Sequence, residues 1–121
     1  MGMDVYGRKP SALEGEYFRR NVWNWRALAD YCRHVAPEEC RHCKSWNTND
    51  RYGLKAKHAI RLADRLQEAL SDGSAAAYIA ERDAYFADHP NKLRFYCGFL
   101  APDDVARFIA FLRASGGFRI L

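Results

Sequence analysis

Apolar side chains recur every three or four residues in four stretches of this 121-residue chain. That interval is the spacing of one face of an α-helix. It predicts four main helices, over residues 22–35, 54–70, 75–88 and from 102 to the Ser115-Gly116-Gly117 run. The last helix is the best marked, because Pro102 suits a first turn and Asp103 and Asp104 favour the positive end of a helix dipole.

Two short segments alternate in polarity instead, as strands do. One runs from Met3 to Tyr6 and the other from Phe118 to Leu121. A two-stranded ribbon is only marginally stable alone, so we expect this pair to pack on the helices. The predicted fold is mainly α. It is a bundle of about four helices in a single domain over residues 1–121, with a small two-stranded β element that pairs the N- and C-terminal segments.

The composition narrows the class of protein. Hydrophobic residues make up 49% of the chain, enough to bury a core without disulfides. No apolar run approaches the roughly 20 residues of a membrane-spanning helix, and the N-terminus lacks the apolar stretch of a signal peptide. We therefore expect a cytoplasmic protein without a membrane partner. The net charge of +4 permits a nucleic-acid partner.

The irregular segment 37–53 contains the motif Cys40-Arg41-His42-Cys43. A C-x-x-C pair can place two thiolates on one zinc ion, but a structural zinc needs four ligands. The candidate set is Cys40, Cys43, Cys97 and His34, which predicts one structural zinc at most. Because no second C-x-x-C or His pair follows, ordinary free thiols are the alternative.

An aromatic and basic stretch covers residues 17–26. Trp25 falls on the apolar face of its helix, whereas Trp23 lies about 160° away. Either that helix is buried on two sides or Trp23 is exposed. Exposed Trp and Arg side chains are typical of protein interfaces and also of base stacking. The candidate partner-binding residues are Arg19, Arg20, Trp23, Arg26, Lys44 and Trp46.

Four motifs stand out along the chain: M-G-M-D-V-Y-G (1–7), G-E-Y-F-R-x-N-V-W-x-W-R (15–26), N-D-x-x-G-L (49–54) and F-L-R-x-S-G-G-F-x-I (111–120). Together they resemble a family of small bacterial and phage proteins without an assigned activity. The resemblance covers most of the chain and implies no particular chemistry. This chain has Arg51 where a glycine is common in the family, and the Cys40–Cys43 pair is an addition to the pattern.

Three functional hypotheses follow. The first is a non-enzymatic protein that acts by protein–protein contact, since no catalytic motif is present. The resemblance to phage proteins suggests a particular version of it, an inhibitor of a host defence system of the anti-CRISPR kind. The second is an enzyme whose site combines Asn49 and Asp50 with a histidine, and a cleft joining Asp50 to such a histidine would support it. The third is a nucleic-acid-binding module that uses Arg19, Arg20, Arg26, Lys44, Lys55 and Lys57.

Overall fold

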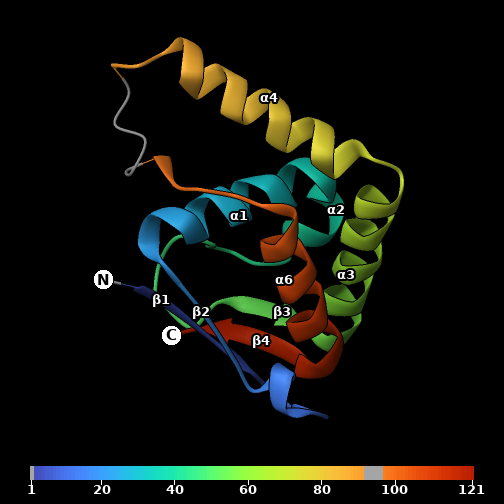
Figure 1. The fold of residues 1–121 in the computed structure, drawn as a ribbon. Helices are drawn as coiled ribbons and strands as arrows, with labels where there is room; N and C mark the ends of the chain where they lie inside the picture. The colour runs from blue at the N-terminus through green and yellow to red at the C-terminus, as the bar shows by residue number, and fades with distance from the viewer. Residues whose placement is uncertain (1, 92–96) are drawn as a thin grey trace.

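Four antiparallel strands form one sheet, in the order β2-β1-β4-β3 (Figure 1). The C-terminal strand therefore lies between the N-terminal strand and a short strand from the middle of the chain. The structure is a computed structural model that describes residues 2–91 and 97–121. The strands are β1 (Gly2–Gly7), β2 (Tyr17–Asn21), β3 (Gly53–Lys55) and β4 (Gly117–Ile120).

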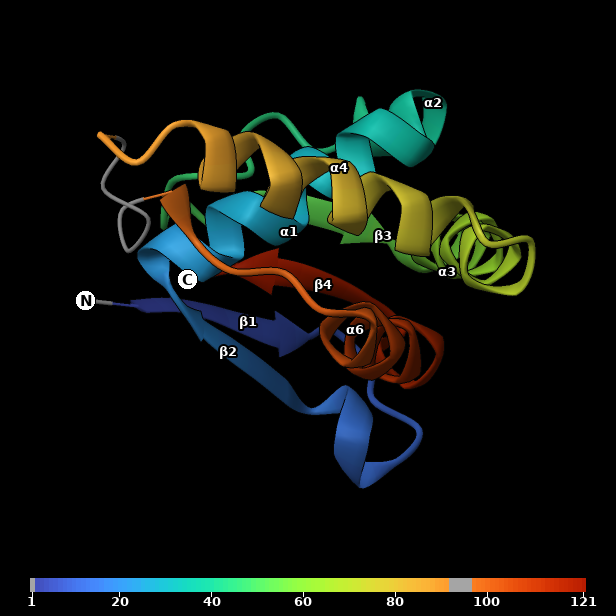
Figure 2. The same ribbon diagram turned by 45° about the horizontal axis from the view of Figure 1, so that its top comes forward.

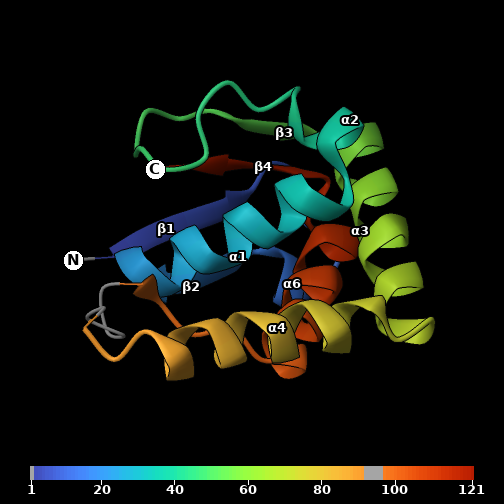
Figure 3. The same cartoon turned by 90° about the horizontal axis from the view of Figure 1, so that it is seen from above.

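The long helices gather on one face of this sheet, and no described helix covers the opposite face (Figure 1 and Figure 2). From above, the connection between α2 and β3 runs along one side of the molecule and α4 along the other (Figure 3). The helical elements are η1 (Leu13–Gly15, a 3-10 turn), α1 (Val22–Val35), α2 (Pro37–Cys40), α3 (Ala56–Ser71), α4 (Ser74–Asp88) and α6 (Pro102–Ser115).

The expected helical bundle with a two-stranded element is wrong, because the four-stranded sheet makes this an α+β fold. The predicted pairing of the chain ends is confirmed, with Val5 opposite Ile120 in the register of β1 and β4. What the sequence concealed was the two outer strands. β2 places Arg20 on its inward side, where an apolar residue would have revealed the alternation, and β3 has only three residues.

The predicted helices are found with small changes at their ends. The helix at Val22–Val35 has the expected bounds, and Asn21 caps it by accepting a hydrogen bond from the Asn24 N–H at 2.8 Å. α3 begins two residues later than predicted, because Leu54 and Lys55 belong to β3. Gly116, with φ of 68°, ends α6 in the left-handed conformation that glycine adopts readily.

Two tryptophans fasten the connection between α2 and β3 to the core. The Trp25 Nε1–H donates a hydrogen bond to the Trp46 carbonyl at 2.6 Å, and the Trp46 Nε1–H donates to the Cys40 carbonyl at 3.1 Å. Their rings stack with centroids 6.1 Å apart, and both side chains are buried. This segment is long and irregular, yet its middle is fixed against α1.

An ion pair joins β2 to α6. The Arg20 guanidinium lies 2.5 Å from the Asp104 carboxylate, and the two side chains are only 10% and 13% exposed. Burial tends to raise the pKa of Asp104, but hydrogen bonds from Arg20 and from the Ala101 N–H outweigh it and leave this pKa below its ordinary value. The carboxylate is therefore charged at neutral pH, and its loss would leave a largely buried arginine uncompensated.

We predict that Asp104→Asn lowers the free energy of unfolding by about 2–4 kcal/mol at pH 7, because it leaves the Arg20 charge without its partner. Since the folded-state pKa is depressed, the contribution of Asp104 is complete above about pH 5 and declines as the pH falls below about 4. Urea unfolding of the wild type and of Asp104→Asn at several pH values measures the loss at pH 7 and its decline at low pH. The neighbouring Asp103→Asn is the control. Its side chain is 79% exposed and pairs with Arg107, so we expect a change within about 0.5 kcal/mol. Equal losses in the two variants would contradict the prediction.

Candidate functional site

A hollow beside β3 collects cationic side chains from four parts of the chain, and we call it the basic pocket. Its volume is about 310 Å³. Arg8 comes from the segment after β1, and four lining residues come from the connection between α2 and β3. The others come from β3 itself and from the first turn of α3. The lining residues are Arg8, His42, Lys44, Arg51, Tyr52, Gly53, Lys55, Lys57 and His58.

The charge in this pocket is uncompensated. Five lining residues are Arg or Lys, two are His, and none is Asp or Glu. No ion pair within the described ranges involves any of the five cations, whereas the ion-paired bases belong to β2 and to the helices and the turn after α2. The first turn of α3 also carries no acid, and no side chain caps it, so the positive end of this helix adds to the field. A pocket of this kind favours a multiply charged anion.

Hydrogen bonds to β4 hold two of the arginines in place. The Arg8 N–H donates to the Gly117 carbonyl at 2.8 Å, and its Nε–H donates to the Phe118 carbonyl at 3.2 Å. The Arg51 N–H donates to the Ile120 carbonyl at 2.8 Å. These contacts use backbone oxygens and not carboxylates, so they position the guanidinium groups without neutralising them.

Arg51 has φ of 71°, which makes it the one described non-glycine residue with a positive φ. This left-handed conformation costs an L-residue roughly 1–2 kcal/mol, and glycine avoids that cost. The chain therefore tolerates backbone strain at a residue that adds a positive charge to the pocket.

Two histidines stack at one side of the pocket. The rings of His42 and His58 have centroids 3.7 Å apart and an interplanar angle of 11°. Desolvation lowers the pKa of His58 below its ordinary value, and the positive charges of His42 and Lys57 lower it further. An anion that entered the pocket would oppose this shift and favour protonation of His58.

We predict that NMR titration finds a His58 pKa below 6.5, and that a saturating amount of inorganic phosphate raises it. The physical reason is that the bound anion offsets the repulsion from His42 and Lys57. His89, which caps the C-terminus of α4, serves as the internal control, and its ring resonances should not shift when phosphate is added. A His58 pKa that does not respond to phosphate at low ionic strength would contradict an anion site here.

The residues expected to bind a partner are dispersed. Arg19 pairs with Asp4 at 3.1 Å and Arg20 is held by Asp104, so both serve the fold. Arg26 is exposed and lines a different hollow, between α1 and α4. Of the residues proposed for partner contact, Lys44 alone lies in the basic pocket, with its ammonium 5.2 Å from the centre of the Tyr52 ring.

Trp23 and Trp46, which were expected to contact a partner, are less exposed than that role requires. Trp46 is 3% exposed and belongs to the core, which leaves little of its surface for a partner. Trp23 is half-buried, so neither the fully exposed nor the fully buried arrangement describes it. Burial of Trp46 could not be read from its sequence neighbours, because it sits in an irregular segment without periodicity.

The proposed zinc ligands do not meet. Cys40 and Cys43 are buried, and burial raises the pKa of their thiols to about 12 and about 11. His34 packs against Tyr78 at 5.0 Å between ring centroids, while the carbonyl of Cys97 accepts a hydrogen bond from Arg82. No group of three or more His, Cys, Asp or Glu able to hold a metal exists among the residues that the structure describes. The zinc stays a prediction without a geometric site.

The enzyme hypothesis gains no support from the five pockets described among residues 2–91 and 97–121, because Asp50 lines none of these five. Asn49 and Asp50 are exposed, and neither lines the pocket that contains His42 and His58. Two lining residues of the basic pocket that the sequence analysis did not propose as binding residues are Arg8 and Arg51. The excess of bases in segment 37–61, six against three acids, already indicated a basic surface there. Arg8 could not be assigned to it, because only the pairing of β1 with β4 brings Arg8 to the pocket.

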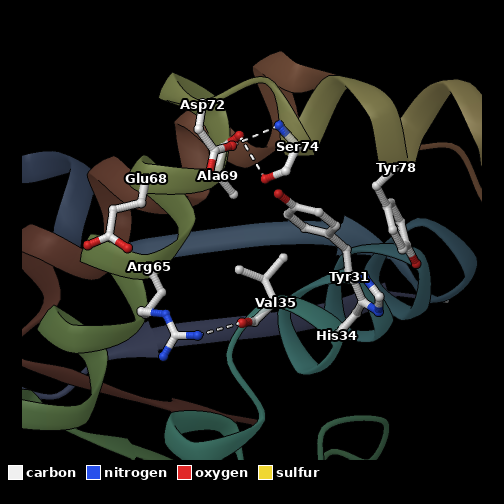
Figure 4. A pocket seen from close by; sticks show the side chains of 9 residues that line it. All are labelled: Tyr31, His34, Val35, Arg65, Glu68, Ala69, Asp72, Ser74 and Tyr78. Carbon is white, nitrogen blue, oxygen red and sulfur yellow. Dashed lines mark hydrogen bonds between the residues drawn. The ribbon is translucent and has the colours of Figure 1, made fainter.

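A second hollow, of about 260 Å³, lies where α1, α3 and α4 meet (Figure 4). Figure 4 shows Glu68 and Asp72 on one wall and Tyr78 on the other. Asp72 accepts a hydrogen bond from the Ser74 N–H at 2.8 Å, and Arg65 donates to the Val35 carbonyl at 3.0 Å. Its polar groups are thus largely engaged within the fold, and its charge is mixed.

The Tyr31 hydroxyl beside this hollow is buried and has no hydrogen-bond partner in the described part of the chain. Burial raises the pKa of Tyr31 to about 12, so the hydroxyl stays neutral. We predict that Tyr31→Phe leaves the free energy of unfolding unchanged or raises it by up to about 1 kcal/mol, because an unpaired buried hydroxyl is unfavourable. Chemical denaturation measures it. A loss of more than about 1 kcal/mol would show that the hydroxyl has a partner.

Comparison of the chain with protein-family models, with curated proteins and with solved structures gives no match in any of the three. Among the described helices, none combines the length and the apolar character needed to span a bilayer. The arrangement of side chains therefore has to carry the functional argument.

Proposed function

We propose that the protein binds nucleic acid and that the basic pocket holds its phosphates. The observation that carries the proposal is the set of five Arg and Lys side chains that line one hollow without a single acid. Phosphate contacts from Lys, Arg and backbone N–H groups supply most of the affinity in nucleic-acid complexes. The pocket offers all three, since the uncapped start of α3 lies beside it.

The pocket is open to a chain-like ligand. Its five cations are all exposed, and they spread from Arg8 over Arg51 to Lys57 at the start of α3. A single small anion would leave several of these charges unused, whereas a polyanion would contact them in succession. Tyr52 contributes an aromatic ring within the same lining, next to Lys44.

Protein–protein contact, with inhibition of a host defence system as one version, has less support than it had from the sequence. That hypothesis depended on a clustered Trp and Arg surface. Two of its arginines pair with Asp4 and Asp104, and Trp46 lies in the core. It stays a prediction, and the proposal of nucleic-acid binding takes its place as the better supported one.

We predict that Arg51→Gly weakens binding of a fluorescein-labelled oligonucleotide while the free energy of unfolding stays equal or rises by up to about 1 kcal/mol. Glycine relieves the left-handed strain at this position, and the entropy of the unfolded chain offsets part of that gain. Removing one phosphate contact should also reduce the slope of log Kobs against log salt concentration by about 1. Fluorescence anisotropy over a salt series and urea unfolding measure the two effects.

Arg107→Gln is the matched control, because it removes the same charge from α6 at a side chain that is 66% exposed and already paired with Asp103. We expect its affinity and salt slope to equal those of the wild type. If both variants weaken binding equally, overall charge and not the pocket explains the affinity. Absence of binding to any oligonucleotide at low salt would refute the proposed function.

A further inference from the structure

The uncovered face of the sheet carries a row of side chains that the proposed function has not yet used. Successive residues of a strand point to opposite faces. Met3, Val5, Phe118 and Ile120 are buried beneath the helices, so their neighbours along the strands point away from the core. Among those neighbours are Tyr6 and Arg119, which are both exposed. On β2, the exposed Tyr17 adjoins Phe18, which packs against the core.

The strand register places these residues side by side. Tyr17 of β2 lies opposite Tyr6 of β1, Tyr6 lies opposite Arg119 of β4, and Arg119 lies opposite Gly53 of β3. We call this set the tyrosine row. It crosses all four strands, over three strand spacings of roughly 14 Å in total. Its last member, Gly53, also lines the basic pocket, so the two features are continuous.

The two tyrosine rings are large and accessible. They are 43% and 44% exposed, and their centroids lie 5.0 Å apart with planes tilted by 45°. The Tyr17 hydroxyl donates a hydrogen bond to the Asp4 carboxylate at 2.5 Å, which fixes the far edge of its ring. Because side chains alternate along a strand, Tyr6 and Tyr17 project on the side of the sheet opposite to that of the buried Val5.

The charge around the row selects the ligand. Asp4, two residues before Tyr6 on β1, forms an ion pair with Arg19 at 3.1 Å and accepts the hydrogen bond from Tyr17. Arg119 follows the tyrosines in the row, and Lys55 extends the positive charge along β3. A surface with aromatic rings at one end and unpaired cations at the other is complementary to bases that are joined by phosphates.

We infer that the ligand is a single-stranded nucleic acid, whose bases stack on Tyr6 and Tyr17 while its backbone continues over Arg119 into the basic pocket. This inference rests on the proposed function and adds the strandedness of the ligand and the groups that recognise it. A duplex keeps its base faces inside its own stack, so it gains nothing from the tyrosines. Base–aromatic stacking tolerates any sequence, so affinity should depend weakly on base identity.

The test compares three fluorescein-labelled ligands with the wild-type protein by anisotropy at low salt. They are a single strand of roughly 12 thymidines, an abasic strand of the same length, and a duplex of the same length. We expect the thymidine strand to bind at least about fivefold more tightly than either of the others. Equal affinity for the abasic strand would overturn the inference and leave the proposed function standing. Absence of binding to all three would refute both.

Substitutions then locate the stacking surface. Tyr6→Leu and Tyr17→Leu should each weaken binding of the thymidine strand at least about fivefold and leave binding of the abasic strand unchanged. Tyr17→Phe keeps the ring and should bind like the wild type. Tyr85→Leu is the matched control, because Tyr85 is 46% exposed on α4, across the molecule from the row.

Two results would count against the tyrosine row itself. The first is a loss of affinity that is the same for Tyr17→Leu and Tyr17→Phe, since that would assign the effect to the hydroxyl and not to the ring. The second is a dimer in light scattering that dissociates in Tyr17→Leu, since a second copy of this chain would then cover the face. The comparison of the three ligands needs no variant, so it decides the inference even if a substitution impairs folding.

Discussion

β4 exchanges hydrogen bonds with β1 on one side and with β3 on the other, and so the last strand of the chain occupies the middle of the sheet. Two glycines with positive φ lead into β4. Gly116, which precedes the strand, has φ of 68°, and Gly117, its first residue, has φ of 92°. A Cβ atom at Gly117 would lie 2.7 Å from the Leu54 carbonyl oxygen. The turn from α6 into β4 therefore requires glycine for two reasons, its conformation and the close approach of β3. Without this turn, β1 and β3 would have no common neighbour.

The basic pocket and the tyrosine row both depend on that central strand. Carbonyl groups of β4 position Arg8 and Arg51, which approach from opposite ends of the chain's first half. Arg119, which belongs to β4, lies between the tyrosines and Gly53. Arg8, Arg51 and Tyr6 are remote from one another in sequence and come together because each lies against β4. No short sequence motif is needed for this, so none marks the proposed binding surface.

Much of the helical part of this fold could be predicted, because helix periodicity and capping are local. The residues Val22 to Val35 and Pro102 to Ser115 show this most clearly. The outer strands could not be predicted, since β3 is too short to display alternation and Arg20 points inward to reach Asp104. Lys44, Lys55 and Lys57 were predicted as nucleic-acid contacts and do line one pocket. Arg8 was not, because strand register alone brings it there.

The cations of this protein fall into two groups. Those with an acidic partner stabilise the fold, and the five that line the basic pocket are proposed to bind the ligand. Both arginines of β2 and several arginines of the helices pair with acids, as Arg20 does with Asp104 and Arg113 with Asp64. The five cations of the basic pocket lie against backbone carbonyls, an aromatic ring and the start of α3, none of which neutralises them. Their mutual repulsion opposes folding, and a polyanion would remove it. Ligand binding and stability are therefore thermodynamically linked through β4, because the strand that holds the pocket together also carries the repulsion that a ligand relieves.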